Sequence, residues 1–187
     1  DIFAGKDTLI LTDPVMGDDG EVYPIYTEGL RERFCELVNR SYVITPNLTE
    51  ALLLLHGKEG MEKKWREFQS INGEERLVRI QETGRSLAEK FSLSAVVITG
   101  VDHKEEGEPL RMGNLVLEKG KSSWIFAEKS GGSYSGTGDL FASVLSAGLV
   151  KGYPMEKCAQ IAVDFISASI QDAVKEGTDR NDGVCFE

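Results

Sequence analysis

Apolar residues fall in short continuous runs that are separated by longer amphipathic stretches. The runs at 8–13, 41–44 and 95–99 are rich in Val, Ile and Leu, which is typical of short strands buried within a sheet. The stretches at 27–39 and 76–91 place apolar residues three and four positions apart, which predicts amphipathic helices. Strands that alternate with helices in this way favour an α/β fold with parallel strands.

The C-terminal half has a different pattern. Two further strands are predicted at 111–117 and 122–127, joined by a turn at 118–121, which together make an antiparallel hairpin. Helices are predicted at 140–150, ended by a glycine, and from Pro154 to about residue 174. We therefore predict an open α/β sandwich with a mostly parallel sheet and an antiparallel edge hairpin.

Two regions have weaker patterns. Residues 56–75 are charged and contain several glycines, so we expect a surface excursion with a short helical piece over 61–68, anchored by Trp65. The tail from 175 to 187 is polar and is expected to be irregular.

The composition limits the possible partners. Asp and Glu number 31 against 21 Lys and Arg, a net charge of −10, which disfavours nucleic acid and anionic membranes. No apolar run has membrane-spanning length. Cys35, Cys158 and Cys185 are widely spaced, which argues against a zinc site or a disulfide framework. Cys35 and Cys158 fall in helical patterns and are expected to be core or semi-buried thiols. The expected compartment is the cytoplasm.

The stretch from Gly131 to Asp139 is the first candidate site. Small and flexible residues lead directly into the helix predicted at 140–150. The N-terminus of a helix carries free N–H groups and a partial positive charge, which suit a phosphate or an oxyanion, and Asp139 is placed to accept a proton from an attacking hydroxyl. The alternative is an ordinary capped turn. The motif is not a Walker A loop.

Carboxylates also follow the predicted strands. Asp13 and Asp18 follow the first strand, where open α/β sheets bind ligands, and oxygen ligands of this kind suit hydrated Mg²⁺. The alternative is an acidic turn, because Asp-Asp-Gly is turn chemistry. Asn47 and Glu50 follow the second strand with capping-box spacing at the start of a helix through 51–55. Glu50 is thus either a cap or a ligand of a metal or its water.

Four segments, in this order, resemble the motifs of the ribokinase-like superfamily of small-molecule kinases. They are Asp13-Pro14-Val15-Met16-Gly17-Asp18 with Gly20 and Tyr23, Thr45-Pro46-Asn47-Leu48-Thr49-Glu50, Val97-Ile98-Thr99-Gly100, and Ser135-Gly136-Thr137-Gly138-Asp139. Members of this superfamily carry a further N-terminal region that bears most of the substrate pocket. The resemblance therefore implies that residues 1–187 form the C-terminal, nucleotide-binding part of one ribokinase-like three-layer domain, N-terminally incomplete.

The resemblance also implies a role for each matching residue. Asp139 would be the catalytic base and would bind substrate together with Tyr23. The implied anion hole is formed by the amides of Gly136, Thr137 and Gly138. The implied metal ligands are Asp13, Asp18 and Glu50. The implied ATP-binding residues are Asp13, Thr45, Asn47, Glu50, Thr99, Trp124, Ile125, Phe126 and Ala127.

The implied reaction is ATP-dependent phosphorylation of the 5′-hydroxymethyl group of a vitamin B6 alcohol: pyridoxal, pyridoxine or pyridoxamine. Its cofactors would be Mg²⁺ and a monovalent cation such as K⁺, and the implied assembly is a homodimer. Asp139 favours this branch over the hydroxymethylpyrimidine kinases, which commonly have Cys at that position. Two alternatives stay open: a kinase for a pyrimidine or another small alcohol, and an inactive nucleotide-binding fragment.

Overall fold

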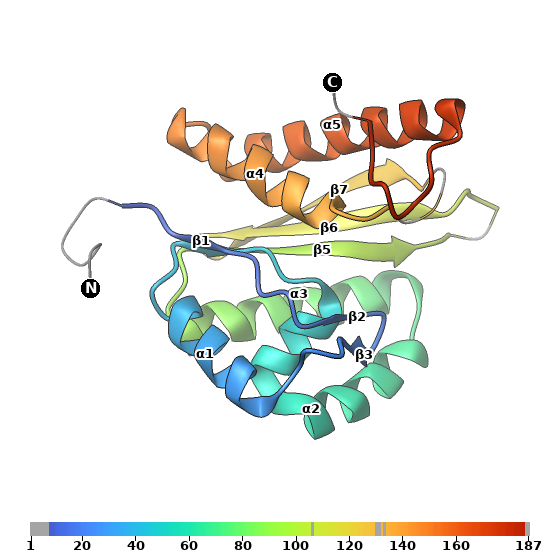
Figure 1. Cartoon of the computed structure of the whole chain (residues 1–187). Coiled ribbons are helices and arrows are strands. Elements are labelled where there is room, and N and C mark those ends of the chain that lie inside the picture. The colour runs from blue at the N-terminus through green and yellow to red at the C-terminus, as the bar shows by residue number, and fades with distance from the viewer. Residues whose placement is uncertain (1–7, 106, 130–131, 133, 186–187) are drawn as a thin grey trace.

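A central sheet lies between two layers of helices, as Figure 1 shows. The computed structural model describes residues 8–105, 107–129, 132 and 134–185. Helices α1, α2 and α3 cover one face of the sheet, and α4 and α5 cover the other (Figure 1). The strands are β1 (Leu11–Thr12), β4 (Val43–Ile44), β5 (Ala95–His103), β6 (Arg111–Glu118) and β7 (Lys121–Glu128), with a separate hairpin of β2 (Gly17–Asp18) and β3 (Glu21–Val22). The helices are α1 (Glu28–Val38), α2 (Leu48–Gln69), α3 (Gly73–Phe91), α4 (Thr137–Val150) and α5 (Met155–Glu176).

The described sheet has the strand order β1-β4-β5-β6-β7. The β1–β4 and β4–β5 pairs are parallel, with Leu11 opposite Val43 and Val43 opposite Ala95. The β5–β6 and β6–β7 pairs are antiparallel, so β7 runs in the same direction as β5. The mostly parallel sheet and its antiparallel edge hairpin are confirmed.

Strand β5 is covered by helices on both faces, which explains its continuous run of apolar residues. Val96 and Ile98 pack into the core beneath α1, α2 and α3, whereas Ala95 and Val97 pack into the core under α4 and α5. Since successive side chains point to opposite faces, a strand covered on both sides must be apolar at every position. Cys158 lies fully buried in the second core, which confirms the prediction of a core thiol there.

Two local predictions were wrong. The structure continues α2 to Gln69 across a kink at Gly57, where the surface excursion was expected. The segment after β1 is also more ordered than a loop, because β2 and β3 pair as a small hairpin. In both places the local pattern is weak, and contacts with distant parts of the chain supply the order.

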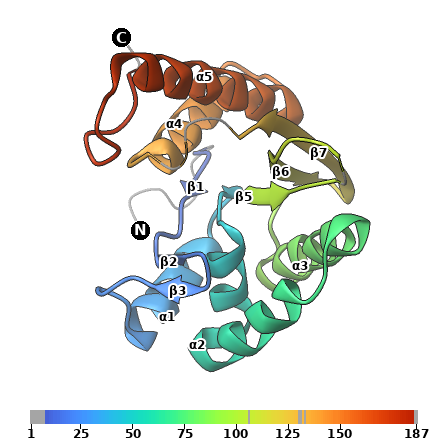
Figure 2. The ribbon, with the colours of Figure 1, turned by 90° about the vertical axis from the view of Figure 1, so that its right-hand side faces the viewer.

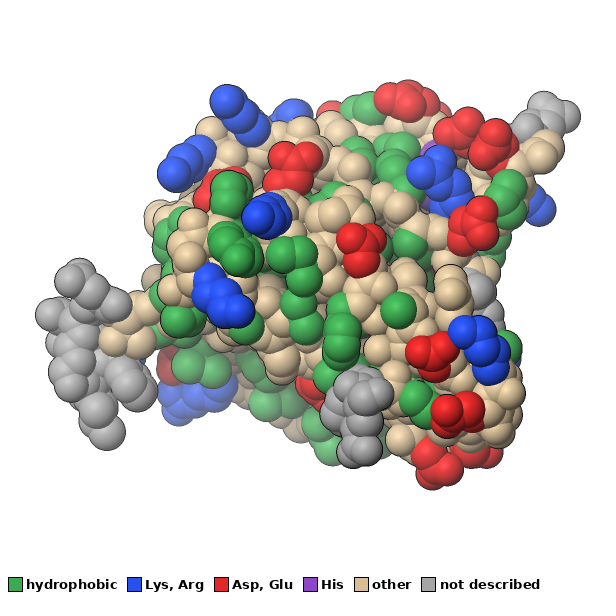
Figure 3. Space-filling view, turned by 90° about the horizontal axis from the view of Figure 1, so that it is seen from above, with side chains coloured by type: hydrophobic (Ala, Val, Ile, Leu, Met, Phe, Trp, Pro, Cys, Tyr) green, Lys and Arg blue, Asp and Glu red, His purple; other side chains and the backbone are tan. Residues whose placement is uncertain are grey.

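The face of the molecule formed by α4 and α5 mixes hydrophobic, acidic and basic side chains (Figure 3). Its exposed hydrophobic residues include Val150, Tyr153 and Ile161. Within the part of the chain that the structure describes, no helix is both long and apolar enough to cross a membrane.

Candidate active site

The carboxyl ends of β1, β4 and β5 meet at one edge of the sheet, the edge that faces the viewer in Figure 2. Asp13 directly follows β1 and Thr45 directly follows β4, and the Thr45 hydroxyl donates a 2.8 Å hydrogen bond to Asp13 Oδ1. Asn47 forms an isolated parallel bridge with Thr99 of β5. The fold thus brings together four of the residues predicted to bind ATP.

Asn47 and Glu50 form the predicted capping box at the start of α2. The Asn47 side chain accepts from Glu50 N at 2.9 Å, and Glu50 Oε2 accepts from Asn47 N at 3.0 Å. The second carboxylate oxygen, Oε1, accepts from Met16 N at 3.0 Å. Glu50 is therefore a cap that also holds the segment after β1.

Burial raises the pKa of Glu50 to about 8, although its two backbone donors lower it. The negative charges of Asp13 and Asp18 raise it further. Burial likewise raises the pKa of Asp13, with an added contribution from Asp139, while the Thr45 hydrogen bond opposes the rise. The negative charges of neighbouring carboxylates thus add to the burial that disfavours ionisation of Glu50 and Asp13 at this edge.

A divalent cation would relieve this repulsion, so the donor set fits Mg²⁺. Among the described residues, however, no three His, Cys, Asp or Glu side chains are grouped closely enough to hold a metal directly. Both oxygens of Glu50 already accept hydrogen bonds from backbone amides. Asp13, Asp18 and Glu50 therefore fit a hydrated ion, of which Mg²⁺ keeps several waters.

The hairpin of β2 and β3 carries Asp18 and leads to Tyr23. Its tip has positive φ at Asp19 (47°) and Gly20 (79°), the conformation of a type I′ turn. The Asn47 amide donates to Gly17 O at 2.8 Å. Burial raises the pKa of Tyr23, and the charges of Asp18, Glu50 and Asp13 add to the rise, so this phenol lies toward the carboxylates.

Helix α4 presents its N-terminus to the same edge. Gly136 is the N-cap, with φ 80° and ψ 0° and no side-chain cap. Nothing in the described parts of the chain accepts from the amides of Gly136, Thr137 and Gly138. A Cβ built at Gly138 would lie 3.9 Å from Asp13 Oδ2, so the two segments face each other closely. Asp139 is exposed in the first turn of α4.

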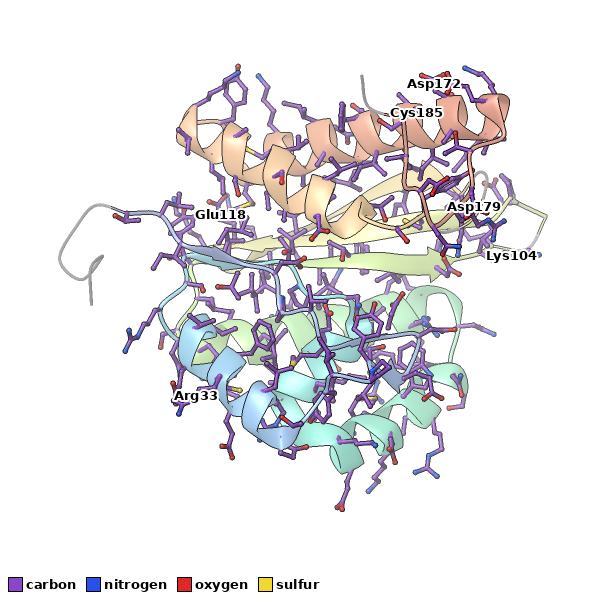
Figure 4. All side chains as sticks on the ribbon, viewed as in Figure 1. Arg33, Lys104, Glu118, Asp172, Asp179 and Cys185 are labelled. Carbon is purple, nitrogen blue, oxygen red and sulfur yellow. The ribbon has the colours of Figure 1, made fainter. Side chains whose placement is uncertain are left out.

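The tail beyond α5 packs against the turn before α4. Ser135 N donates to Arg180 O at 3.0 Å, and Val184 shares a small buried cluster with Tyr134 and Ala173. Figure 4 places Asp179 and Cys185 in this returning segment. The segment is irregular, as predicted, but it helps to fix the glycine turn. Gly131 and Ser133 of the predicted stretch lie outside the described residues.

The four β7 residues predicted to border ATP point to different faces of the sheet. Trp124 packs against the α1–α3 core and stacks with Phe126 at 5.6 Å between ring centroids. Ile125 and Ala127 pack into the core under α4 and α5. Since successive residues of a strand point to opposite faces, these four cannot line one surface together. Their role in binding ATP stays a prediction.

Sequence reasoning did not predict the two contacts that α2 makes with the hairpin tip. Thr49 Oγ1 accepts from Gly20 N at 2.8 Å. The indole of Trp65 covers Gly20 so closely that a Cβ there would lie 2.3 Å from the ring nitrogen. The only signal in the sequence was a lone tryptophan in a charged stretch, and it gave no partner.

The ribokinase-like kinases share this arrangement: a three-layer sandwich in which carboxylates and the N-terminus of a helix without a side-chain cap lie at the carboxyl ends of the strands. The sequence profile of the phosphomethylpyrimidine kinase family matches residues 3–183, and the chain belongs to this family. The family is one of kinases of the phosphomethylpyrimidine kinase and pyridoxal kinase type.

Individual relatives agree with this assignment. A pyridoxine/pyridoxal/pyridoxamine kinase from Bordetella avium is 29% identical over 159 residues, covering 84% of this chain and 48% of the relative. A crystal structure of a putative phosphomethylpyrimidine kinase from Bacteroides thetaiotaomicron superposes with a TM-score of 0.80 at 25% identity, over 98% of this chain and 58% of the other.

The pyridoxal kinase from Leishmania donovani, in complex with ADP and pyridoxamine, superposes with a TM-score of 0.60 at 26% identity. The superposition covers 89% of this chain and 52% of the Leishmania protein. The chain thus spans about half the length of these relatives.

Proposed function

We propose that residues 1–187 form the nucleotide-binding part of a kinase that transfers the γ-phosphoryl group of ATP to the 5′-hydroxymethyl group of pyridoxal, pyridoxine or pyridoxamine. One observation carries the proposal: Asp139 lies in the first turn of α4, beside amides that have no acceptor among the described residues, and the neighbouring Gly138 faces Asp13 at the end of β1. A base, an anion site and a metal-compatible carboxylate at one edge are the parts that phosphoryl transfer needs.

In this proposal Asp139 accepts the proton of the substrate hydroxyl as its oxygen attacks the γ-phosphorus. The bond from that phosphorus to the β–γ bridging oxygen breaks, and ADP leaves with the electron pair. The amides of Gly136, Thr137 and Gly138 donate to the oxygens of the transferred group and stabilise its negative charge. Tyr23 lies near the carboxylates and would contact the substrate.

The proposed cofactor is Mg²⁺, held through water by Asp13, Asp18 and Glu50, and it would offset the charge of the β- and γ-phosphates. A monovalent cation such as K⁺ is proposed as a second aid. The ADP complex of the Leishmania relative supports ATP as the co-substrate. Thr45, Asn47 and Thr99 lie beside Asp13 and would line the phosphates. A homodimer and a cytoplasmic location also remain proposals.

The family match supports a second candidate substrate. A kinase for hydroxymethylpyrimidine would use the same edge of the sheet, and the name of the matched family favours it. Parallel turnover measurements with pyridoxal and hydroxymethylpyrimidine, at saturating ATP and Mg²⁺, separate the two. Faster turnover of the pyrimidine would overturn the vitamin B6 assignment and leave the kinase class intact.

The Asp139→Asn variant tests the catalytic base. A general base contributes about 100-fold to 10,000-fold in rate, so we expect kcat to fall by at least about 100-fold while ADP affinity changes little. Steady-state turnover and calorimetry with ADP give the two quantities.

The matched control is Asp172→Asn, a carboxylate that is paired with Lys175 on α5 (Figure 4). This control should leave kcat unchanged. Normal turnover by Asp139→Asn would remove Asp139 from its proposed role.

A further inference from the structure

The β2–β3 hairpin is too small to hold its shape alone. Each of its strands has two residues, and an isolated two-stranded hairpin is only marginally stable in water. Its tip also places Asp19, a residue with a side chain, at a φ of 47°, which L-residues adopt rarely. The position of Asp18 must therefore be fixed by contacts with other elements.

The base of the hairpin is fixed by residues already discussed. Met16 N donates to Glu50, and Gly17 O accepts from Asn47. These bonds lie before Asp18 along the chain, so they do not hold the turn that follows it.

The tip is fixed by two other side chains of α2. Thr49 is 1% exposed, and its hydroxyl oxygen accepts from Gly20 N at 2.8 Å. Trp65 lies four turns further along α2, beyond the kink, and its indole lies flat enough against Gly20 to leave no room for a Cβ. One side chain thus holds the tip by a hydrogen bond and the other supports it by contact.

We propose that Thr49 and Trp65 are positioning residues that hold the Asp18–Gly20 turn. Through this turn they would place the Asp18 carboxylate where it can interact with the Mg²⁺ of a bound nucleotide. The inference rests on the proposed nucleotide site but not on the identity of the phosphate acceptor. In this proposal neither residue contacts the phosphates. Their effect is on the metal-dependent part of nucleotide binding, because only Asp18 depends on the tip.

The Thr49→Val variant tests this inference, since it keeps the shape of the side chain and removes the acceptor of Gly20 N. We expect the affinity for ADP in the presence of Mg²⁺ to fall roughly three- to tenfold, as for the loss of one hydrogen bond. The affinity for ADP in EDTA should be unchanged. Thr49→Ser keeps the hydroxyl and should restore the Mg²⁺-dependent affinity. Calorimetry on the 187-residue chain measures both.

Trp65 provides a second, spectroscopic readout. Addition of Mg²⁺ to the ADP-saturated chain should change the indole emission, because the turn that covers Trp65 tightens around the ion. Trp65→Phe leaves Trp124 as the sole tryptophan and should abolish that Mg²⁺-dependent change. It should also weaken ADP binding only when Mg²⁺ is present.

Thr83→Val is the matched control, because Thr83 is a buried helical threonine whose hydroxyl bonds within α3 to Arg79 O. It should leave both affinities unchanged. The inference is overturned if Thr49→Val binds Mg²⁺–ADP as the wild type does, if it weakens ADP equally in EDTA, or if the wild type shows no Mg²⁺-dependent binding. Absent vitamin turnover by a protein in which the rest of the kinase domain accompanies this chain, with that binding intact, overturns the proposed substrate alone.

Discussion

Glu28 links three segments through one carboxylate. It accepts from the Tyr26 hydroxyl at 2.6 Å and from Arg31 Nε at 2.7 Å. It also accepts from Lys58 N at 3.3 Å, just beyond the kink in α2. These hydrogen bonds lower the pKa of Glu28 to about 2 from its ordinary value of 4.5. The bond from Tyr26 contributes most, the bond from Arg31 less, and the bond from Lys58 N least. The ionised form is therefore the one that the folded chain favours.

A group whose pKa is lowered on folding stabilises the protein fully above its unfolded pKa, and the effect is lost as the pH falls. We expect Glu28→Gln to lower the free energy of unfolding by about 1 kcal/mol at pH 7. The difference between variant and wild type should shrink as the pH falls from about 5 toward 2. Urea unfolding at several pH values measures it.

Glu36→Gln removes an exposed carboxylate whose ion pair among the described residues is with Arg33 on the same helix, and it should change stability less. A Glu28→Gln effect that is the same at pH 7 and pH 3 would contradict the role of the ionised carboxylate.

At the scale of residues, the sequence predicted the local contacts of the site but not the contacts between residues far apart in the chain. Asn47 and Glu50 have the spacing of a capping box, so the cap was one of the two roles predicted for Glu50, and the structure confirms it. That Glu50 also binds Met16 N, 34 positions away, has no local signal. The same holds for Thr49 and Gly20, whose partnership exists only once the sheet has brought α2 beside the hairpin.

At the scale of elements, α2 is the clearest departure from the predicted structure. Residues 56–75 have the composition of a loop, yet α2 passes through most of them with a kink at Gly57, where φ is 69° and ψ is −177°. The helix resumes because Glu28 bonds to Lys58 N and because Met61 and Phe68 are buried. These tertiary contacts override weak local propensity.

The kink itself depends on glycine. Its φ and ψ lie in a region that residues with a Cβ adopt only at a cost of about 1–3 kcal/mol, and we expect Gly57→Ala to destabilise the chain by that amount. A Cβ there would make only ordinary 3.7 Å contacts with the Glu28 oxygens, so the cost comes from the backbone. Thermal or urea unfolding measures it.

Gly29→Ala is the matched control, since Gly29 lies within α1 without a positive φ, and a Cβ there would make only an ordinary 3.9 Å contact with Thr27 Oγ1. Alanine there should be neutral or stabilising by up to about 1 kcal/mol. Equal effects of the two substitutions would contradict the account of the kink.

At the scale of the whole molecule, the order of strands and helices followed from the apolar pattern, because buried parallel strands and amphipathic helices have distinct periods. The edge of the sheet where the site lies was predictable for the same reason. What could not be predicted was the course of the tail from 178 to 185, which returns to support the turn before α4 through Ser135 and Arg180. A polar segment in which apolar residues do not recur at a regular spacing gives no sign of where it packs.

Strand β1 is an outer strand of the described sheet. The carbonyl groups of Ile10 and Thr12 bond to β4, so the alternating groups of Leu9 and Leu11 point toward the open side. Leu9 is also 40% exposed. Unpaired backbone beside apolar side chains is a template for another strand, and the 187-residue chain studied alone should self-associate through this edge.

Leu9→Lys places a charge on that edge, and charged residues on edge strands oppose further pairing. We expect the variant to sediment as a monomer at concentrations where the wild-type chain associates, with little change in unfolding free energy because Leu9 is only partly covered. Val150→Lys is the control, since Val150 is 82% exposed at the end of α4 and its substitution should leave association unchanged. A wild-type chain that stays monomeric at high concentration, or association that Leu9→Lys does not reduce, would show that this edge is closed by other means.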